Sequence, residues 1–273
     1  MRRLLGAAAL LLTLATPALA EDSITLAGVL SQGGLARGEA PPGTILVLDG
    51  RAVRVALDGE FILGFGRDAP VRMTLTATFP DGRTSTREIS LEKREYEIQR
   101  INGLPPQMVT PDPALMTRIK AELDKVHGVR KIDSDQLGFE STLEWPVTGP
   151  ISGVYGSQRI LNGEPRAPHL GVDIAAPIGT PIHADSAGTV TLAEHDLYFT
   201  GGTVIVDHGY GLSSIYQHMS RLDVTVGQHI EQGDLVGAVG ATGRVTGPHL
   251  HWGMSWYDVP IDPQLLAGPM PKE

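Results

Sequence analysis

The sequence predicts an all-β protein made of a small immunoglobulin-like β-sandwich, a linking segment with one helix, and a Gly-rich β-barrel or sandwich-hybrid domain. Three observations support this class. Glycine (33) and proline (20) are plentiful and aromatic residues make up 5% of the chain, so many turns and short strands are expected. Apolar and polar residues alternate in the N-terminal half, as they do in half-buried strands. One segment alone has a helical pattern.

Residues 1–20 have the pattern of a secretory signal peptide. Two arginines follow the first methionine, residues 4–14 are apolar, and residues 18–20 (Ala-Leu-Ala) resemble a cleavage site. The apolar run is too short to cross a bilayer, and no later run reaches that length. We therefore expect a periplasmic or otherwise secreted protein that is soluble once the signal is removed and has no membrane span.

The composition excludes several functional classes. The formal net charge is −9 and the few lysines and arginines are dispersed, which argues against a nucleic-acid partner. The chain has no cysteine, so it contains no disulfide, thiolate nucleophile, thiolate metal ligand or lipidated cysteine.

Residues 21–97 are predicted to form the β-sandwich. Alternation is clearest from Val71 to Phe79, where apolar residues occupy every second position. Three Asp-Gly pairs, at residues 49–50, 58–59 and 81–82, predict hairpin turns. Six to seven short strands in this length favour an immunoglobulin-like sandwich, although the cysteines and tryptophan of that fold are missing. With no chemical motif present, a binding or spacing module is expected.

Residues 98–144 are predicted to be a linker with one amphipathic helix at about 112–127. Asp112 is a suitable N-cap and proline follows at the first helical position. Apolar residues then recur three and four positions apart, at Met116, Ile119, Leu123 and Val126. The sequence leaves open whether this helix packs on either domain or lies across a functional site.

Residues 145–273 are predicted to be the second β domain. Short apolar segments alternate with glycines, and no helical pattern of sufficient length occurs after residue 143. The predicted strands include residues 189–193, 203–206, 213–216 and 235–239.

Four histidines and one aspartate in this domain form the candidate site: His169, Asp173, His218, His249 and His251. His249 and His251 are two apart on a predicted strand, so both point to one face, with Cα atoms roughly 7 Å apart. His169 and Asp173 would be roughly 13 Å apart in an extended strand, too far to share one ion. Gly171 between them predicts a kinked turn or a close backbone approach.

These side chains suit a hydrolytic metal site. Such a site needs three protein ligands and an open position for water, and it also needs groups that move protons. Five side chains divide into three ligands and two proton carriers, but spacing alone does not say which histidines are ligands.

The residues around these positions resemble the lysostaphin-type (LytM-domain, peptidase family M23) zinc metallopeptidases that cut peptidoglycan. The resemblance covers about residues 145–262 and lies in three fragments: the run from His169 to Ile182, Tyr216-Gln217-His218, and the run from Thr242 to His251. It implies one Zn²⁺ held by His169, Asp173 and His251. It also implies that His218 and His249 are catalytic and activate the attacking water and stabilise the oxyanion.

The other candidate residues are weaker. Structural or surface roles are expected for His127, His183, His195 and His229, while His208 is a candidate hydrogen-bonding group behind the site. Four further residues are expected either to line a substrate groove or to be ordinary core or rim residues, and the sequence favours neither: Tyr155, Arg159, Tyr198 and Trp252.

Two other functions are alternatives to a peptidase. Residues 226–236 resemble the β-hammerhead of biotinyl and lipoyl domains, but no lysine lies between Lys131 and Lys272 to carry a cofactor. A non-catalytic, cell-wall-binding regulator of another peptidoglycan hydrolase, with a regulatory partner of unknown identity, is the second alternative. Because all five positions hold the active-type residue, we predict an exported zinc endopeptidase acting on peptide cross-links or stem peptides of peptidoglycan.

Overall fold

The computed structural model describes residues 24–271. The signal peptide predicted at residues 1–20 lies outside the described residues. Strands dominate the structure, and the predicted all-β class is confirmed.

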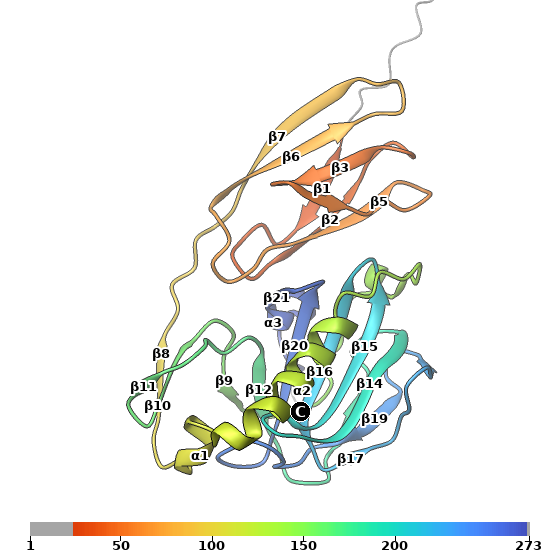
Figure 1. Ribbon diagram of the computed structural model, residues 1–273. Coiled ribbons are helices and arrows are strands. Elements are labelled where there is room, and N and C mark those ends of the chain that lie inside the picture. The colour runs from red at the N-terminus through yellow and green to blue at the C-terminus, as the bar shows by residue number, and fades with distance from the viewer. Residues whose placement is uncertain (1–23, 272–273) are drawn as a thin grey trace, which may run out of the picture.

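Seven strands in two sheets form the N-terminal part of the molecule (Figure 1). They are β1 (Thr25–Gly28), β2 (Leu35–Glu39), β3 (Ile45–Leu48), β4 (Arg51–Val53), β5 (Glu60–Gly64), β6 (Arg72–Thr78) and β7 (Thr84–Ser90). One sheet has the order β1-β2-β5 and the other the order β4-β3-β6-β7. The alternation in β6 places Leu75 and Ala77 in the core, as expected for a strand with one buried face.

Two of the three predicted Asp-Gly hairpins join paired strands. Asp49 and Gly50 both have positive φ and form the two-residue turn between β3 and β4. Residues 81–82 connect β6 to β7. The prediction at residues 58–59 was wrong, because that turn leads from β4 into β5, which belongs to the other sheet.

The linking segment contains one strand, two α-helices and two 3-10 turns. These are β8 (Ile98–Ile101), α1 (Pro106–Val109), the 3-10 turn η1 (Pro113–Leu115), α2 (Met116–Val129) and the 3-10 turn η2 (Gly138–Glu140). The Asp112 side chain accepts a hydrogen bond from the main-chain N of Ala114, so it caps η1 and not α2 itself.

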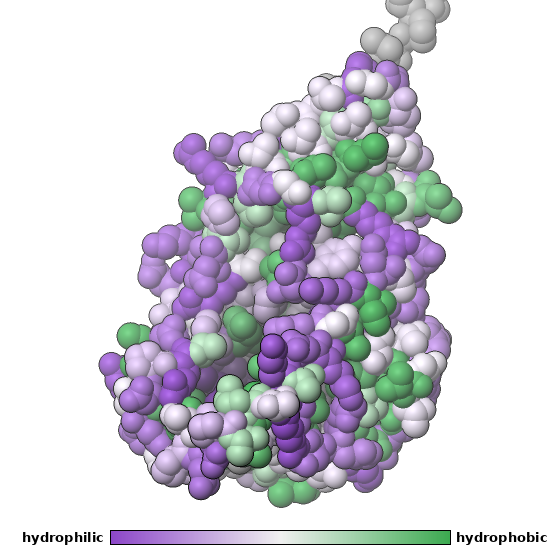
Figure 2. Space-filling view, in the orientation of Figure 1, coloured by the Kyte–Doolittle hydropathy of each residue, from purple (hydrophilic) through white to green (hydrophobic). Residues whose placement is uncertain are grey.

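Helix α2 lies along the large sheet with hydrophilic side chains outward (Figure 2). Ile119 is buried, and Val126 and Val129 pack on a cluster of buried residues from that sheet. The predicted apolar face was partly wrong, because Met116 and Leu123 are 49% and 46% exposed. The buried side of the helix therefore consists of Ile119, Val126 and Val129.

The C-terminal part is built from a large sheet and two smaller ones. Its elements are β9 (Ile151–Gly153), β10 (Gln158–Leu161), β11 (Glu164–Pro165), β12 (Val172–Ala175), β13 (Pro181–His183), β14 (Gly188–Leu197), β15 (Gly201–Gly209), β16 (Leu212–Met219), β17 (Arg221–Leu222), β18 (His229–Ile230), β19 (Leu235–Ala238), β20 (His249–Trp256), β21 (Val259–Ile261) and α3 (Pro263–Ala267). The large sheet has the order β18-β14-β15-β16-β20-β12-β9, and β21 pairs with β20. The small sheets are β13-β19-β17 and β11-β10-β8, so the linker strand β8 joins the C-terminal part.

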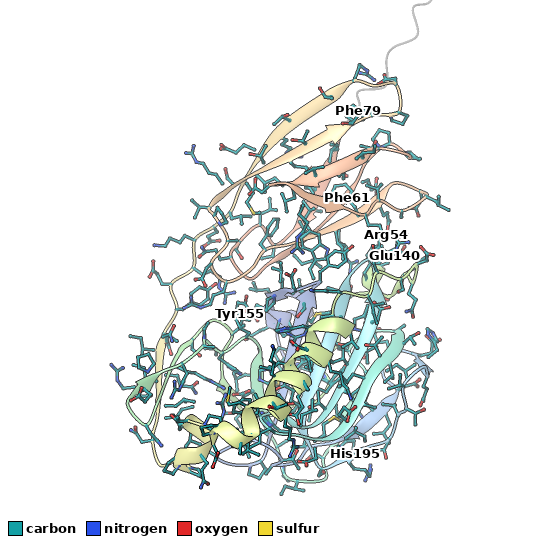
Figure 3. All side chains as sticks on the ribbon, in the orientation of Figure 1. Arg54, Phe61, Phe79, Glu140, Tyr155 and His195 are labelled. Carbon is teal, nitrogen blue, oxygen red and sulfur yellow. The ribbon has the colours of Figure 1, made fainter. Side chains whose placement is uncertain are left out.

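One buried core extends from the N-terminal sheets into the large sheet. A Cβ added at Gly64 of β5 would lie 2.5 Å from Cβ of Trp256 in β20, so the two parts are in direct contact. Arg54 donates a 2.8 Å hydrogen bond to Asp133, and Arg37 donates to the carbonyl of Glu140. Figure 3 places Arg54 and Glu140 at this junction.

Within residues 24–271, no helix combines the length and apolar character that crossing a bilayer requires.

Candidate metal centre

Strands β12 and β20 are neighbours and carry three of the five predicted site residues. They pair antiparallel with Asp173 opposite His251, and His249 lies two residues earlier on β20. Leu250 and Trp252 are fully buried. Because side chains alternate along a strand, these apolar residues face the core while His249 and His251 share the opposite face with Asp173.

His169 joins this pair from the loop before β12. Its Nε2 lies 2.8 Å from Nδ1 of His251 and 2.9 Å from Oδ1 of Asp173. Nδ1 of His251 lies 2.8 Å from the same carboxylate oxygen. In the part of the chain that the structure describes, no other three His, Asp or Glu side chains bring ligand atoms this close together. The three atoms form a compact triangle.

Gly171 allows this triangle to form. Strand β12 begins at Val172, so the chain from His169 to Gly171 is not extended as a strand. A Cβ at Gly171 would lie 2.6 Å from Nε2 of His251 and 2.6 Å from the carbonyl oxygen of Trp252. Gly171 does not have a positive φ. The glycine is therefore required by the close approach of β20, which was one of the two roles predicted for it.

Three of the four histidines have a tautomer fixed by the main chain. In each, Nδ1 faces a carbonyl oxygen, which accepts hydrogen bonds and cannot donate, so Nδ1 carries the proton. Each neutral ring then keeps its lone pair on Nε2. The contacts are His169 with Val154 O (3.2 Å), His218 with Thr242 O (2.8 Å) and His249 with Gly247 O (2.9 Å).

His218 and His249 lie beside the triangle. Their ring centroids are 4.8 Å apart, and the ring of His218 is 6.2 Å from that of His251. Nε2 of His249 is 3.8 Å from Oδ1 of Asp173. His218 has a φ of 66°, an unfavourable conformation for a non-glycine residue. Its main-chain N–H donates to the carbonyl of Thr200, which holds this conformation in place.

Burial and neighbouring side chains determine which groups of the site are charged. Burial alone would raise the pKa of Asp173, but its close contacts with the imidazoles of His169 and His251 outweigh burial and hold that pKa well below its usual value. Burial and the neighbouring imidazoles lower the pKa of His218 to about 3. Burial also lowers the pKa of His251 to about 4, against the attraction of Asp173. At neutral pH, Asp173 is ionised and both rings are neutral.

The second oxygen of Asp173 is held by an arginine. Nη2 of Arg159 lies 2.9 Å from Oδ2, and burial lowers the pKa of this arginine while Asp173 opposes the shift. A Cβ at Gly153 would lie 2.4 Å from the same oxygen, so β9 also approaches the carboxylate closely. Asp173 therefore offers only Oδ1 to the histidine side of the site.

Two hollows adjoin the site. The smaller, of about 100 Å³, is lined by Asp173, His218 and His249 among others, and the larger, of about 330 Å³, by His169 and His251. The two share three wall residues, Arg159, Leu161 and Arg244. The sequence indicates Arg159 as a candidate groove residue, but it does not predict that Gln99, Arg166 and Arg244 line these hollows. Arg244 lies inside the run from Thr242 to His251 that carried the family resemblance, which was an available signal.

A fully buried polar network supports the strands behind the site. The carboxylate of Asp185 accepts hydrogen bonds from the Tyr216 hydroxyl (2.7 Å) and from Nε1 of Trp252 (2.6 Å). The hydroxyl of Ser214 donates to the same carboxylate (3.0 Å) and contacts Nε2 of His208 (2.7 Å). Trp252 adjoins His251, so the network fixes the strand that carries it. His208 thus belongs to a hydrogen-bonded network behind the site, as the sequence predicts.

The remaining predicted residues lie elsewhere. Four histidines are exposed and none contributes to the triangle: His127, His183, His195 and His229. Figure 3 shows His195 at the end of the molecule opposite the N-terminal sheets. Tyr155 and Trp252 are buried in the core, and the hydroxyl of Tyr198 donates to the carbonyl of Gln107.

The donor set fits zinc. Two imidazole nitrogens and one carboxylate oxygen are ligands that Zn²⁺ accepts, and three protein ligands leave a position open. Ligand atoms about 2.0–2.1 Å from a tetrahedral ion are about 3.3 Å apart, so the triangle would need to open by about half an ångström. His169 already has its lone pair on the nitrogen that faces the other two ligand atoms.

Comparison with known proteins identifies relatives of this region. The model of peptidase family M23 matches residues 167–263, which contain all five predicted site residues. Peptidoglycan DD-endopeptidase ShyA of Vibrio cholerae is 38% identical over 141 residues, 50% of this chain and 32% of that protein. DD-carboxypeptidase/endopeptidase Mpg of Neisseria meningitidis is 36% identical over 104 residues, 38% of this chain and 24% of that protein. The chain thus spans a third or less of the length of these curated relatives.

A solved structure matches almost the whole molecule. It is the crystal structure of a candidate M23 peptidase from Pseudomonas aeruginosa, with 31% sequence identity and a TM-score of 0.68. The match covers 88% of this chain and 95% of that one, so it includes the N-terminal sheets and the linker as well as the region around the metal triangle.

Proposed function

Because this chain belongs to peptidase family M23, we propose that it is a zinc-dependent endopeptidase that hydrolyses peptide cross-links or stem peptides of peptidoglycan. The observation that supports this most is the convergence of His169, Asp173 and His251 beside two further imidazoles. The names of the curated relatives support peptidoglycan as the substrate.

In this proposal His169, Asp173 and His251 hold one zinc ion. When bound, the ion supplies Lewis acidity and lowers the pKa of water. The protein keeps its ligands ready for this role, because Asp173 is ionised and His251 is neutral at physiological pH. Arg159 positions Asp173 through Oδ2 and leaves Oδ1 for the ion.

In this proposal, His218 and His249 accept a proton from the attacking water and pass it on. Each has its Nδ1 proton directed at a main-chain carbonyl, which leaves the Nε2 lone pair to accept a hydrogen bond or proton from the attacking water. A protonated ring can then donate to the oxyanion or to the leaving amine. The low pKa of His218 keeps this ring neutral before reaction, and His249 is the more open of the two.

We further propose the division of the chain that the sequence predicts. Residues 1–20 are a signal peptide for export, residues 21–97 an immunoglobulin-like module, residues 98–144 a linker, and residues 145–273 the peptidase domain. Export to the periplasm agrees with peptidoglycan as the substrate.

The decisive experiment incubates the protein, without residues 1–20 and loaded with Zn²⁺, with purified muropeptide dimers. Chromatography of the products should show monomers for the wild type and none for His249→Ala with zinc content unchanged. Monomers that never form, or that form equally in the variant, would refute the proposal. Protein that holds no zinc and leaves peptidoglycan intact would instead support the alternative, a non-catalytic regulator of another peptidoglycan hydrolase.

A further inference from the structure

Three arginines gather where the two hollows meet. Arg159 and Arg244 line both hollows, and Arg166 lines the larger one together with His169 and His251. The guanidinium of Arg244 stacks on the ring of Phe199, 4.5 Å from its centroid, which fixes its position. These side chains come from β10, the loop after β11 and the loop before β20, so only the folded chain brings them together.

The gathering gives the lining of the two hollows more positive than negative charge. Among the described residues that line the two hollows, Asp173 is the only one with a carboxylate, and the histidines and Arg159 already contact it. Burial, followed by the charges of Arg159 and Arg166, lowers the pKa of Arg244. The chain as a whole carries −9, so an excess of positive charge here is specific to this site.

Arg166, which lines the larger hollow, has a buried donor without a partner. Its Nη2 donates to Oγ1 of Thr110 at 3.0 Å. Its Nε is the one buried side-chain nitrogen or oxygen, of all those between residues 24 and 271, without a hydrogen-bond partner. A buried donor without a partner is costly, so it points to a missing acceptor.

We propose that Arg166 and Arg244 form a carboxylate-binding subsite next to the metal triangle, and that it selects peptides with a free carboxylate on the residue that follows the scissile amide. Guanidinium groups match planar carboxylates with paired hydrogen bonds, which gives such a subsite its specificity. The scissile amide would lie by His218 and His249 in the smaller hollow, and the carboxylate would reach the larger one. This inference rests on the proposed function and narrows its substrate class.

Binding can be tested separately from hydrolysis. The zinc-loaded chain, ¹⁵N-labelled, is titrated with N-acetyl-D-alanine and with N-acetyl-D-alaninamide while the arginine Nε–Hε signals are followed by NMR. We expect the carboxylate to shift the Arg166 and Arg244 signals and to bind at least about tenfold more tightly than the amide. Arg244→Gln should remove this preference and Arg244→Lys should restore part of it. Arg221→Gln, an exposed arginine paired with Asp223, is the matched control and should change nothing.

Activity on muropeptide dimers gives the second readout. Arg166→Gln and Arg244→Gln should raise KM about tenfold or more with kcat within about twofold, because the subsite binds substrate away from the reacting atoms. Equal binding of acid and amide, no binding of either, or equal shifts with inorganic phosphate would overturn the subsite. If dimers are cleaved but the acid and the amide bind equally, the proposed peptidase activity stands and the subsite is refuted. A carboxylate preference without cleavage supports the subsite and refutes the peptidase.

Discussion

Asp173 organises the site at the scale of single residues. Oδ1 faces His169 and His251, while Oδ2 binds Arg159, so one carboxylate connects the other two candidate metal ligands to a positioning cation. His218 and His251 are neutral at physiological pH because burial lowers the pKa of each ring. This arrangement favours metal binding and makes the metal-free fold sensitive to acid.

We predict that the metal-free protein loses stability as the pH falls from 6.5 toward 4. His218 and His251 have folded pKa values of about 3 and about 4, below the ordinary value of 6.5. The unfolded chain therefore binds more protons in this range, and each histidine lowers the free energy of unfolding by about 1.4 kcal/mol per pH unit. Urea denaturation in the presence of a chelator measures the slope. His218→Gln should reduce it by one proton and exposed His195→Gln should not, and equal slopes in all three proteins would contradict the prediction.

Gly171→Ala should weaken zinc binding. The added methyl would meet His251 and the carbonyl of Trp252 at 2.6 Å, so β12 and β20 must separate and the ligand triangle must open on one side. We expect zinc affinity, measured by competition with a chromophoric chelator, to fall at least about tenfold, in line with changes that disturb metal-ligand positioning. Gly128→Ala in α2, where a Cβ meets nothing within 4 Å, is the control. Unchanged affinity in Gly171→Ala would show that the strands separate without affecting the ligands.

At the scale of elements, the linker forms one wall of the site. Strand β8 pairs with β10 with Gln99 opposite Arg159, and Ile101 and Leu104 line the smaller hollow. The side chain of Asn162 accepts from the main-chain N of Leu104 and donates to its carbonyl oxygen. Helix α2 packs on the large sheet and contributes no residue to either hollow. The element beside the site is therefore β8 with α1, and not the predicted helix.

Asn162→Gly should loosen this wall and increase activity on polymeric peptidoglycan. The variant keeps the positive φ of residue 162 and removes two hydrogen bonds, worth about 1–3 kcal/mol together. Hydrogen exchange in residues 103–109 should become faster, and release of peptides from sacculi should rise a few-fold. Faster exchange with unchanged release would mean that the linker does not limit access.

At the scale of the whole molecule, the N-terminal sheets and the large sheet share one core. Phe61 and Trp252 belong to the same buried cluster, and β5 contacts β20 at Gly64 and Trp256. Arg54 and Arg94 add ion pairs to Asp133 and Asp262 across the junction. The shared core favours cooperative unfolding of both parts.

Gly64→Val should uncouple the two parts. A Cβ at this position would lie 2.5 Å from Cβ of Trp256, and the backbone there needs no positive φ, so the substitution acts on the contact alone. Calorimetry should give one transition for the wild type and two for the variant, with the metal-stabilised transition moving upward when zinc is added. A single transition in both proteins would show that the ion pairs maintain the coupling.

The sequence by itself determined what depends on local periodicity and residue type. Alternation identified strands such as β6, Asp-Gly pairs identified two hairpins, and the His-x-His spacing placed His249 and His251 on one face. These features depend on neighbours a few residues apart, so they can be read from the chain. The family resemblance of the residues around the five candidate positions could also be read from the chain, and the membership in family M23 is confirmed.

Only the tertiary structure decided what depends on pairing between distant segments. The register of β12 on β20 brings Asp173 against His251, and the main-chain carbonyls that fix the tautomers of His169 and His218 come from other loops. The meeting of Arg166 and Arg244 likewise follows from loop positions that no local pattern encodes. Contacts across long sequence separations depend on the whole fold, because each one requires several strands to be placed first.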